Sequence, residues 1–525
     1  MTTTRTGVRI AKTAAGVAAA AALLGLPAAA SADPTTLTAP AIPGVAALPG
    51  PVVDPGTPAA TMLTLRTTPD VTLPGKAITI SGAGLPAGKQ VTLTWSTADV
   101  SWVVDARPDS VDYLGRAASK HAVRLAQATT DATGSFSVQV KAPADFGGLH
   151  DVYAVVDGVQ VAKGGLLIAR SASISPKSGP IGTPITITYS GLGASLYEGG
   201  ASLLYDNHYA GALMANWTRG VAKATIRATG PVGRHTIEVA DAISVKYLNI
   251  QQSPIPWATG STFTFTVTKD AGRPKPEIDW PATVAPTLGA RTTLGAARLA
   301  ASASATTATL STTSGQVLSK VDVSASGLAP NQPASLVWST VVGSRVNCSG
   351  TCWAFVSVPL GSAAAAADGT LKSSIHVPDG LGGWHVVQVT QDGQVKAQVP
   401  FYVLRSFVGK AVSSLVLHEG QHFTVHLKGL GWTQLDNTIA VDYDNSYVGY
   451  GCGFNSNGDT MMNLVATGGP GTHLIDMYPL LYTQQPSYAN TPYGMVPVLT
   501  YARDLPGLAL GYRLPAMRLA VTIVK

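Results

Sequence analysis

The stretch ITISGAGLPAGKQVTLTWST, residues 78–97, decides the fold, because the chain repeats it as VDVSASGLAPNQPASLVWST at residues 321–340. Both copies alternate apolar and polar residues on either side of a Gly/Pro loop. The last large apolar residue of the pattern is Trp95 in the first copy and Trp338 in the second. A period of two is typical of a strand with one buried face. Each copy therefore predicts two antiparallel strands of a β-sandwich, and the repeat indicates an internal duplication.

The composition favours an all-β protein of several domains. The chain has 525 residues with 55 Gly and 35 Pro, and only 12% of its residues are charged. Helix formers in amphipathic spacing are scarce beyond the N-terminus, and only four glutamates occur: Glu198, Glu238, Glu277 and Glu419. The formal charge of +6 falls to about half without Arg5, Arg9 and Lys12, so no nucleic-acid partner is predicted.

The first 32 residues have the layout of a secretory signal peptide. Three basic residues precede an Ala/Leu-rich run at 13–26, and Ala30-Ser31-Ala32 follows as a small-residue cleavage site. The apolar run is shorter than the roughly 20 residues that a membrane-spanning helix needs. We therefore expect an exported protein, secreted or associated with the cell envelope, without a transmembrane segment.

Four related endings divide the rest of the chain. GGLHDV surrounds His150, VGRHTI surrounds His235, GGWHVV surrounds His385 and PGTHLI surrounds His473. Units of about 100 residues with this strand and turn spacing are typical of seven-stranded immunoglobulin-like sandwiches. The predicted organisation is a Pro/Ala-rich spacer at 33–60, modules 1 (61–169) and 2 (170–270), a linker at 271–307, and modules 3 (308–405) and 4 (406–525).

The borders inside each half are short, whereas the border between the halves is long. LLIARS at 166–171 and FYVLRS at 401–406 contain no Pro/Gly spacer, which predicts two stiff pairs of modules. The linker is Ala, Thr, Ser, Arg and Pro without period, so we expect proteases to cut it first and to release two stable two-module fragments.

Two stretches resemble known families. SPKSGPIGTPITITYSGLG at 175–193 and TTDATGSFSVQVKAP at 129–143 are similar to secreted bacterial immunoglobulin-like repeats of the IPT/TIG type. This resemblance implies sandwiches used as spacers, adhesive modules or carbohydrate-associated modules, with no shared catalytic residues. A fainter likeness, in ISGAGLPAG followed by TTDATGSFS, is to neocarzinostatin-type apoproteins, which implies a binder of a small apolar ligand as an alternative function.

HEGQH at 418–422 matches the HExxH pattern of zinc proteases, in which two histidines one helical turn apart bind the metal. The duplicate has Pro180 and Pro184 at the two histidine positions, which excludes a helix interior there. We expect a turn entering a strand and no metal site. The alternative is a secreted zinc hydrolase that uses His418, Glu419 and His422. Adventitious surface metal binding would instead use His422 and His426, which share one face of the strand.

The remaining polar motifs predict structure rather than chemistry. Each G-x-H histidine is expected to hydrogen-bond a loop at the start of a strand. YDNHYAG at 205–211 and YDNSYVG at 443–449 predict hairpin turns, and no repeated acidic cluster completes a calcium site, so no cofactor is predicted. No nucleophile elbow, phosphate loop or dinucleotide fingerprint is present, so we expect no enzymatic activity.

An insertion breaks the duplication near the C-terminus. Residues 486–515 have no counterpart in the first half and are rich in Tyr and Pro. They either cover a sheet edge or present an aromatic platform that binds a glycan or a protein on a cell surface. The candidate binding residues are Tyr478, Tyr482, Tyr488, Tyr493, Tyr501 and Tyr512.

Three cysteines in an exported chain predict one disulfide. Cys348 and Cys352, in CSGTC, are close enough in sequence to close a small loop. Cys452 is then left as a free thiol or for an intermolecular bridge. The sequence thus predicts a non-catalytic binding or structural protein.

Overall fold

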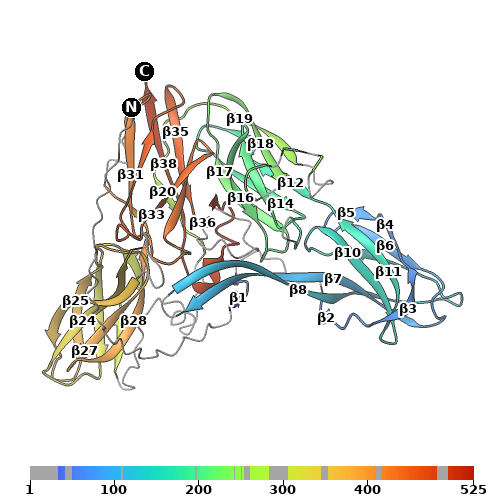
Figure 1. The fold of residues 1–525 in the computed structure, drawn as a ribbon, viewed down its shortest axis with the longest axis horizontal. Helices are drawn as coiled ribbons and strands as arrows, with labels where there is room; N and C mark the ends of the chain where they lie inside the picture. Colours follow the sequence, from blue (N-terminus) through green and yellow to red (C-terminus); the bar gives the residue numbers. More distant parts are fainter. Residues whose placement is uncertain are drawn as a thin grey trace, which may run out of the picture. The chain divides into compact units, whose positions relative to one another are not determined.

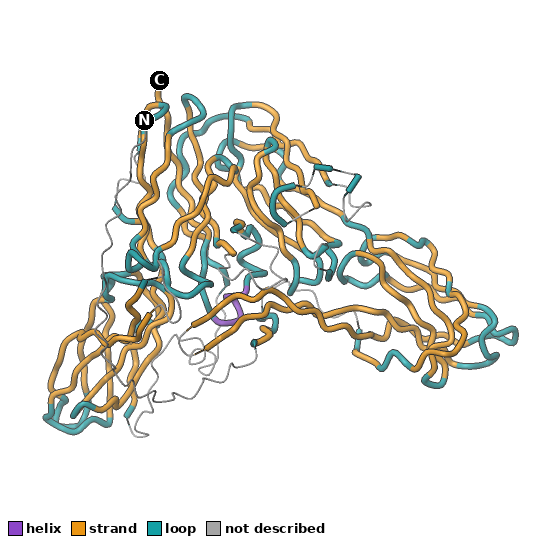
Figure 2. The backbone as a smooth tube through the Cα atoms, viewed as in Figure 1, coloured by secondary structure: helices purple, strands orange, loops and turns teal. Residues whose placement is uncertain are grey.

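In the computed structural model the described residues form β-strands and loops, apart from one five-residue 3-10 helix, η2 (Pro506–Leu510) (Figures 1 and 2). The structure describes residues 34–41, 50–107, 110–195, 198–241, 243–246, 248, 249, 251, 252, 260–282, 306–344, 353–409, 415–481 and 495–525. The all-β class is therefore confirmed for this part of the chain. No helix long and apolar enough to cross a membrane occurs in it. The predicted signal peptide lies outside the described residues.

Module 1 has two sheets around one core. The predicted strands at 78–97 are β6 and β7, and they lie in different sheets that share Ile78, Ile80, Leu93 and Trp95 as buried residues. The smaller sheet has the order β4 (Arg66–Thr68), β6 (Ala77–Gly82), β9 (Phe136–Lys141). The larger sheet comprises β2 (Val52–Val53), β8 (Ser110–Thr129), β7 (Gln90–Arg107), β10 (Gly148–Val156), β11 (Val159–Ile168) and β3 (Thr57–Thr64), with β1 (Thr35–Leu37) on β7 and β5 (Val71–Thr72) on β11.

Modules 2 and 3 repeat the pattern of a three-stranded sheet and a larger one. In module 2 the smaller sheet has the order β12 (Ser171–Ser175), β14 (Pro184–Ser190), β17 (Val221–Arg227). The larger sheet has the order β13 (Ser178–Gly179), β19 (Ser261–Val267), β18 (Gly233–Asp241), β15 (Gly200–Tyr205), β16 (His208–Met214). In module 3 the smaller sheet has the order β21 (Thr307–Leu310), β23 (Lys320–Ser326), β26 (Leu371–His376). The larger sheet has the order β22 (Ser314–Gln316), β28 (Gln394–Leu404), β27 (Gly383–Gln391), β24 (Pro333–Gly343), β25 (Trp353–Ala364).

Module 4 follows the same pattern and adds strands from other parts of the chain. Its smaller sheet has β29 (Ser406–Phe407), β31 (His422–Lys428) and β34 (Thr460–Val465). Its larger sheet has the order β20 (Glu277–Asp279), β38 (Ala516–Val524), β35 (Gly471–Tyr478), β32 (Thr438–Tyr443), β33 (Ser446–Cys452), with β30 (Val416–His418) on β38; β36 (Leu480–Leu481) pairs with β37 (Val496–Pro497).

Parts of the predicted spacer and linker are strands. The spacer range contributes β1, β2 and the first residues of β3, and the linker range contributes β20, which pairs antiparallel with β38 of module 4. Composition alone indicated unstructured segments. Pairing with the free edge of an existing sheet satisfies backbone groups whatever the side chains are, which is why composition missed these strands.

A long hairpin extends module 1 beyond its own core. β7 has 18 residues and β8 has 20, far more than the usual five or six of a strand (Figure 1). The outer part of the hairpin carries Trp102 and Tyr113, which are both buried. They belong to a core cluster that also contains residues of modules 2, 3 and 4, such as Leu203, Tyr402 and Leu499. One hydrophobic core therefore joins the two halves.

The shared core leads to a different expectation for proteolysis than the composition of the linker does. If a specific protease site is inserted within residues 283–305 and cut, we expect the two fragments to co-elute in gel filtration and to separate only in denaturant. The reason is that β20 and the hairpin of module 1 remain packed on module 4. Separate elution of two folded fragments under native conditions would contradict this expectation.

Candidate functional site

The two YDN motifs form equivalent hairpin turns, as predicted. Asp206 and Asn207 connect β15 to β16 with φ of 49° and 67°, and Asp444 and Asn445 connect β32 to β33 with φ of 51° and 59°. Positive φ at both central residues is the signature of the type I′ turn, which Asp and Asn tolerate well. The duplication therefore extends to the backbone conformation of these turns.

A histidine and a tyrosine hold each YDN turn. In module 4, His473 Nδ1 lies 2.6 Å from Asp444 Oδ2, and Nε2 lies 2.9 Å from the Gly469 carbonyl. The His473 ring stacks on Tyr443 at 5.8 Å between centroids. Module 2 has the same arrangement on its own residues: His235, Asp206, Pro231 and Tyr205.

The histidines of modules 1 and 3 stack on tryptophan instead. His150 lies 4.2 Å from Trp95 and His385 lies 4.7 Å from Trp338, measured between ring centroids. In all four modules Nε2 faces the carbonyl oxygen four residues earlier, as in His385 and Leu381 at 2.9 Å. The prediction that these histidines hydrogen-bond loops is confirmed.

The different partners give His385 and His473 opposite pKa shifts. Burial lowers the pKa of His385 to about 4, and its carbonyl partners only partly offset this effect. Burial also lowers the pKa of His473, but the hydrogen bond and charge of Asp444 outweigh it, and the net effect is a raised pKa. His385 is therefore buried in its neutral form, whereas His473 favours the cation.

We expect these two histidines to contribute to stability with opposite pH dependence. For His385 the unfolded chain binds the proton first, so stability falls by on the order of 3 kcal/mol as the pH falls from about 6.5 to about 4. The contribution of His473 is complete below about pH 6.5 and is lost as the pH rises through its raised pKa.

Urea unfolding of His385→Gln and His473→Gln between pH 4 and pH 9 measures both contributions. The decrease in the free energy of unfolding caused by His385→Gln should grow as the pH rises toward neutral. The decrease caused by His473→Gln should shrink as the pH rises above neutral. The same pH slope for both variants would contradict the assignment.

The two YDN turns face one pocket of about 490 Å³. Asp206 and Thr229 of module 2 line it together with Asp444 and Thr467 of module 4. A second pocket, of about 680 Å³, runs along β33 and β34 and is lined by residues such as Val441 and Met462. Both pockets include Val448 and Leu464. We call the two adjoining pockets together the β33/β34 groove.

A buried ion pair holds modules 2 and 4 together beside the groove. Arg227 Nε lies 3.2 Å from Asp476 Oδ2, and Arg227 Nη2 donates to the Leu519 carbonyl at 2.9 Å. Arg227 is 3% exposed and Asp476 is 2% exposed. Asn445 Nδ2 donates to the Arg227 carbonyl at 2.8 Å, so the YDN turn of module 4 is part of this interface.

The neighbouring carboxyl of Asp442 has no hydrogen-bond partner among the described residues. Burial, reinforced by the charge of Asp476, raises the pKa of Asp442 well above its usual value. Burial therefore favours the neutral acid form of Asp442, and the ion pair of Arg227 is formed with Asp476 rather than with Asp442.

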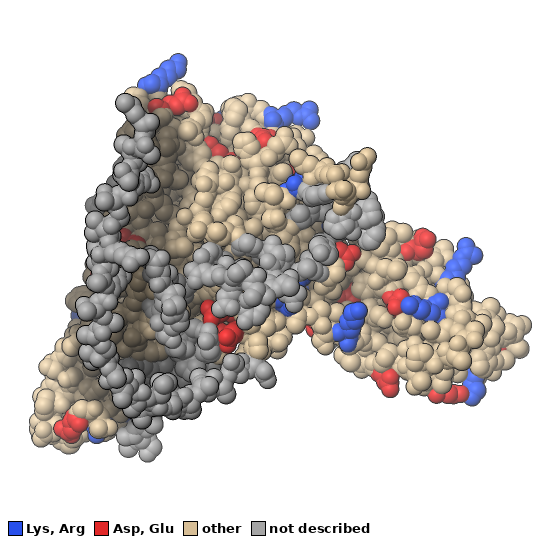
Figure 3. All heavy atoms as spheres, viewed as in Figure 1, with Lys and Arg blue, Asp and Glu red and all other residues tan. Residues whose placement is uncertain are grey.

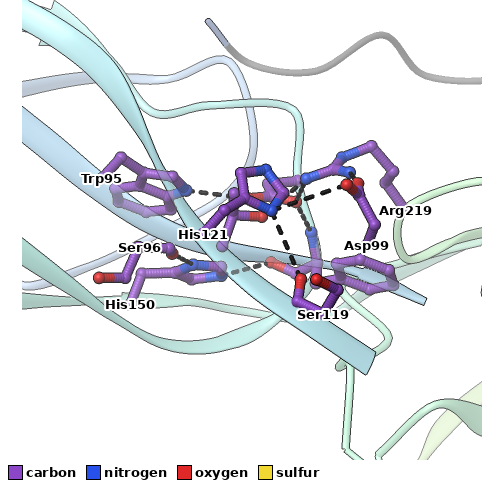
Figure 4. A network of polar contacts seen from close by, with 10 residues as sticks. Trp95, Ser96, Asp99, Ser119, His121, His150 and Arg219 are labelled. Carbon is purple, nitrogen blue, oxygen red and sulfur yellow. Dashed lines mark hydrogen bonds and ion pairs between the residues drawn. The ribbon is translucent and has the colours of Figure 1, made fainter. Parts of the chain in front are cut away.

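A separate polar network joins modules 1 and 2 (Figure 4). Arg219 of module 2 reaches Asp145 at 2.9 Å and Asp99 at 2.7 Å, and Trp95 Nε1 donates to Asp145 at 2.9 Å. Arg219 and Asp145 are both buried. In the second half, Gly380 of module 3 aligns with Asp145, and Asn457 of module 4 aligns with Arg219. Both charges of the ion pair are therefore missing there. We assign this network to the module border rather than to ligand binding.

The structure buries three of the predicted tyrosines. Tyr478, Tyr501 and Tyr512 belong to the shared core and are 0%, 4% and 2% exposed. Tyr482, Tyr488 and Tyr493 lie outside the described residues. The described part of the insertion covers a sheet edge: Val498 pairs with Ala212 of β16. An aromatic platform cannot include the three buried rings, because a ligand does not reach them.

HEGQH is a turn between two strands. His418 ends β30, His422 begins β31, and both are exposed. His426 Nε2 lies 2.5 Å from Asp459 Oδ1. The described residues contain no group of three His, Cys, Asp or Glu side chains that could hold a metal ion. The zinc alternative needs His418 and His422 on one helix, and this segment forms none.

The predicted disulfide cannot be placed, because Cys348 and Cys352 lie outside the described residues. Cys452 ends β33 and is exposed at the groove. Sequence reasoning missed the groove itself. The available signal was a difference between the duplicates: Ala210 and Lys223 in module 2 correspond to Val448 and Met461 in module 4.

No protein-family model matches the chain, and no curated protein matches it either. Among solved structures, a putative membrane anchored protein from Corynebacterium diphtheriae is 13% identical, with 65% of this chain and 90% of that chain covered and a TM-score of 0.17. The sporulation control protein Spo0M from Bacillus subtilis is 8% identical, with 39% and 91% covered and a TM-score of 0.14. The mouse coronavirus receptor-binding domain complexed with its murine receptor is 10% identical, with 39% and 99% covered and a TM-score of 0.13.

Proposed function

We propose that this chain is an exported, non-catalytic binding protein of the cell envelope or the extracellular space. Four immunoglobulin-like modules form its scaffold, and the β33/β34 groove binds a glycan or protein ligand. The N-terminal signal-like segment supports export. The shared core supports a rigid scaffold, because the modules bury apolar side chains against one another.

The observation that carries the proposal is the exposure of apolar side chains on the groove. Val448 is 53% exposed, Met461 is 68% exposed and Val465 is 38% exposed, and they lie on β33 and β34, the end strands of the two sheets of module 4. Clustered apolar exposure beside a pocket marks interaction surfaces in soluble proteins. On the face shown in Figure 3, charged side chains are sparse and scattered, which suits a neutral ligand better than a nucleic acid.

The test compares binding of three forms of residues 33–525 to envelope fractions and to arrayed glycans. The groove variant is Val448→Glu with Met461→Glu. The matched control is Val342→Glu with Val358→Glu, which changes two exposed valines of module 3. We expect binding of the groove variant to be weaker by about tenfold or more, since a bound ligand would bury the two introduced glutamate charges without partners. Wild-type binding by the groove variant would refute the proposal.

A further inference from the structure

The duplication places β16 and β33 in equivalent positions. Ala212 of β16 pairs with Ser202, and its counterpart Tyr450 of β33 pairs with Ala440. Both strands contain the same bulge, at Gly211 with φ of 154° and at Gly449 with φ of 152°. What one strand binds on its outer edge is therefore a guide to what the other can bind.

In module 2 this edge is occupied by the chain itself. Val498 forms a parallel bridge with Ala212, and the Leu499 amide donates to the Ala212 carbonyl at 2.9 Å. Adding a Cβ to Gly211 would bring it within 2.9 Å of the Pro497 carbonyl, so the approach is close. The segment lies on β16 as an added strand, and Ala210 and Ala212 beneath it are fully buried.

In module 4 the corresponding surface is exposed at Val448 and Tyr450, whereas the first residues of β33 pack on β16, with the rings of Tyr447 and Tyr209 6.4 Å apart between centroids. β33 is the last strand of its sheet in the described part of the chain, and the pocket of about 680 Å³ lies along it. Val448 is 53% exposed, whereas its counterpart Ala210 is fully buried. Met461 of β34 aligns with Lys223 of β17, and both side chains are exposed. The fold therefore does not require an apolar residue at this position.

The sequence of β33 also lacks the usual protection of an edge strand. SYVGYGC contains no charged residue and no proline, the residues that normally block pairing with another chain. The bulge at Gly449 does not block pairing, because β16 has the same bulge and pairs with Val498. An unprotected apolar edge that stays exposed is suited to a partner strand.

We infer that the β33/β34 groove binds an extended, apolar peptide segment of a partner protein. The segment adds parallel to β33, as Val498 adds to β16, and its backbone amide donates to a β33 carbonyl. Its small or branched apolar side chains enter between Val448 and Met461. This inference rests on the proposed function and specifies the ligand class of the same groove.

The probe is a fluorescent peptide with the sequence of residues 495–501, MVPVLTY, which is the segment that occupies β16. Fluorescence polarisation with residues 33–525 should show saturable binding. N-methylation of the leucine amide removes the donor that bonds Ala212 in the chain itself, and we expect it to weaken binding about tenfold. The groove variant Val448→Glu with Met461→Glu should bind about tenfold more weakly, and the module 3 control should bind normally.

Hydrogen exchange locates the peptide. Bound peptide should slow the exchange of amides within 446–452 and leave those within 208–214 unchanged. Protection of 208–214 instead would mean that the peptide displaces the chain's own segment, and it would overturn the inference. Equal binding of the N-methylated peptide would overturn strand addition.

Two further outcomes separate this inference from the proposed function. If no apolar peptide binds, but the groove variant loses its envelope or glycan ligand, the groove is functional and the peptide class is wrong. If sedimentation shows self-association that the groove variant abolishes, the occupant is a second copy of the chain, and the inference is overturned.

Discussion

Replacing residues 487–514 by a short Gly/Ser turn is expected to abolish the cooperative folding of the protein. The segment places nine large apolar or aromatic side chains in the core: Val496, Val498, Leu499, Tyr501, Leu505, Leu508, Leu510, Tyr512 and Leu514. Truncating one such side chain costs about 2–5 kcal/mol, and a whole protein is stable by only about 5–15 kcal/mol. The summed loss exceeds the total stability.

Polar contacts of the same segment add to this loss. Asp504 is fully buried and accepts from Trp102 Nε1 of module 1 at 2.7 Å. Deleting Asp504 would leave the indole N–H buried without this acceptor, at a cost of about 1–3 kcal/mol. Near-UV circular dichroism and calorimetry measure the outcome. The graded control is Leu499→Ala, which should lower the free energy of unfolding by about 2–5 kcal/mol and keep the fold. A deletion variant that melts at the wild-type temperature would contradict the burial of this segment.

Arg227→Leu is expected to destabilise the protein by about 3–5 kcal/mol, because it leaves Asp476 as an unpaired buried charge. Arg518 lies opposite Asp476 on β38 and is also buried, but it contacts Asp279 and the Thr225 carbonyl, so among the described residues only Arg227 bonds the Asp476 carboxylate. Asp476→Leu should lower the free energy of unfolding by a similar amount, because it leaves the buried charge of Arg227 unpaired. The double variant should lose less than the sum of the two single losses, because it leaves neither charge alone.

An exposed ion pair serves as the control for this cycle. Lys89 and Asp157 lie 2.9 Å apart with side chains 50% and 72% exposed. Lys89→Ala should change the free energy of unfolding by less than about 1 kcal/mol, since solvent screens the pair. Denaturant unfolding at neutral pH measures all four variants. Strictly additive losses for Arg227→Leu and Asp476→Leu would show that the two side chains do not interact.

The duplication made local structure predictable even where a motif pointed elsewhere. The two prolines opposite His418 and His422 predicted a turn, and the structure has a turn between β30 and β31. The alternation ending in Trp95 and Trp338 predicted strands with one buried face, and both tryptophans are buried. In each case the deciding information lies within a few residues of the position concerned.

What the sequence by itself determined is therefore the all-β class, the repeat, the YDN hairpins and the face that each strand buries. These follow from periodicity and turn chemistry, which act over short distances along the chain. Only the tertiary structure decided what those faces pack against: Tyr501 and Tyr512 inside a shared core, Arg227 on Asp476, and Val498 on β16 rather than on β33. The physical reason is that an alternating pattern requires burial but is satisfied by any apolar partner, so the partner depends on contacts between residues hundreds of positions apart.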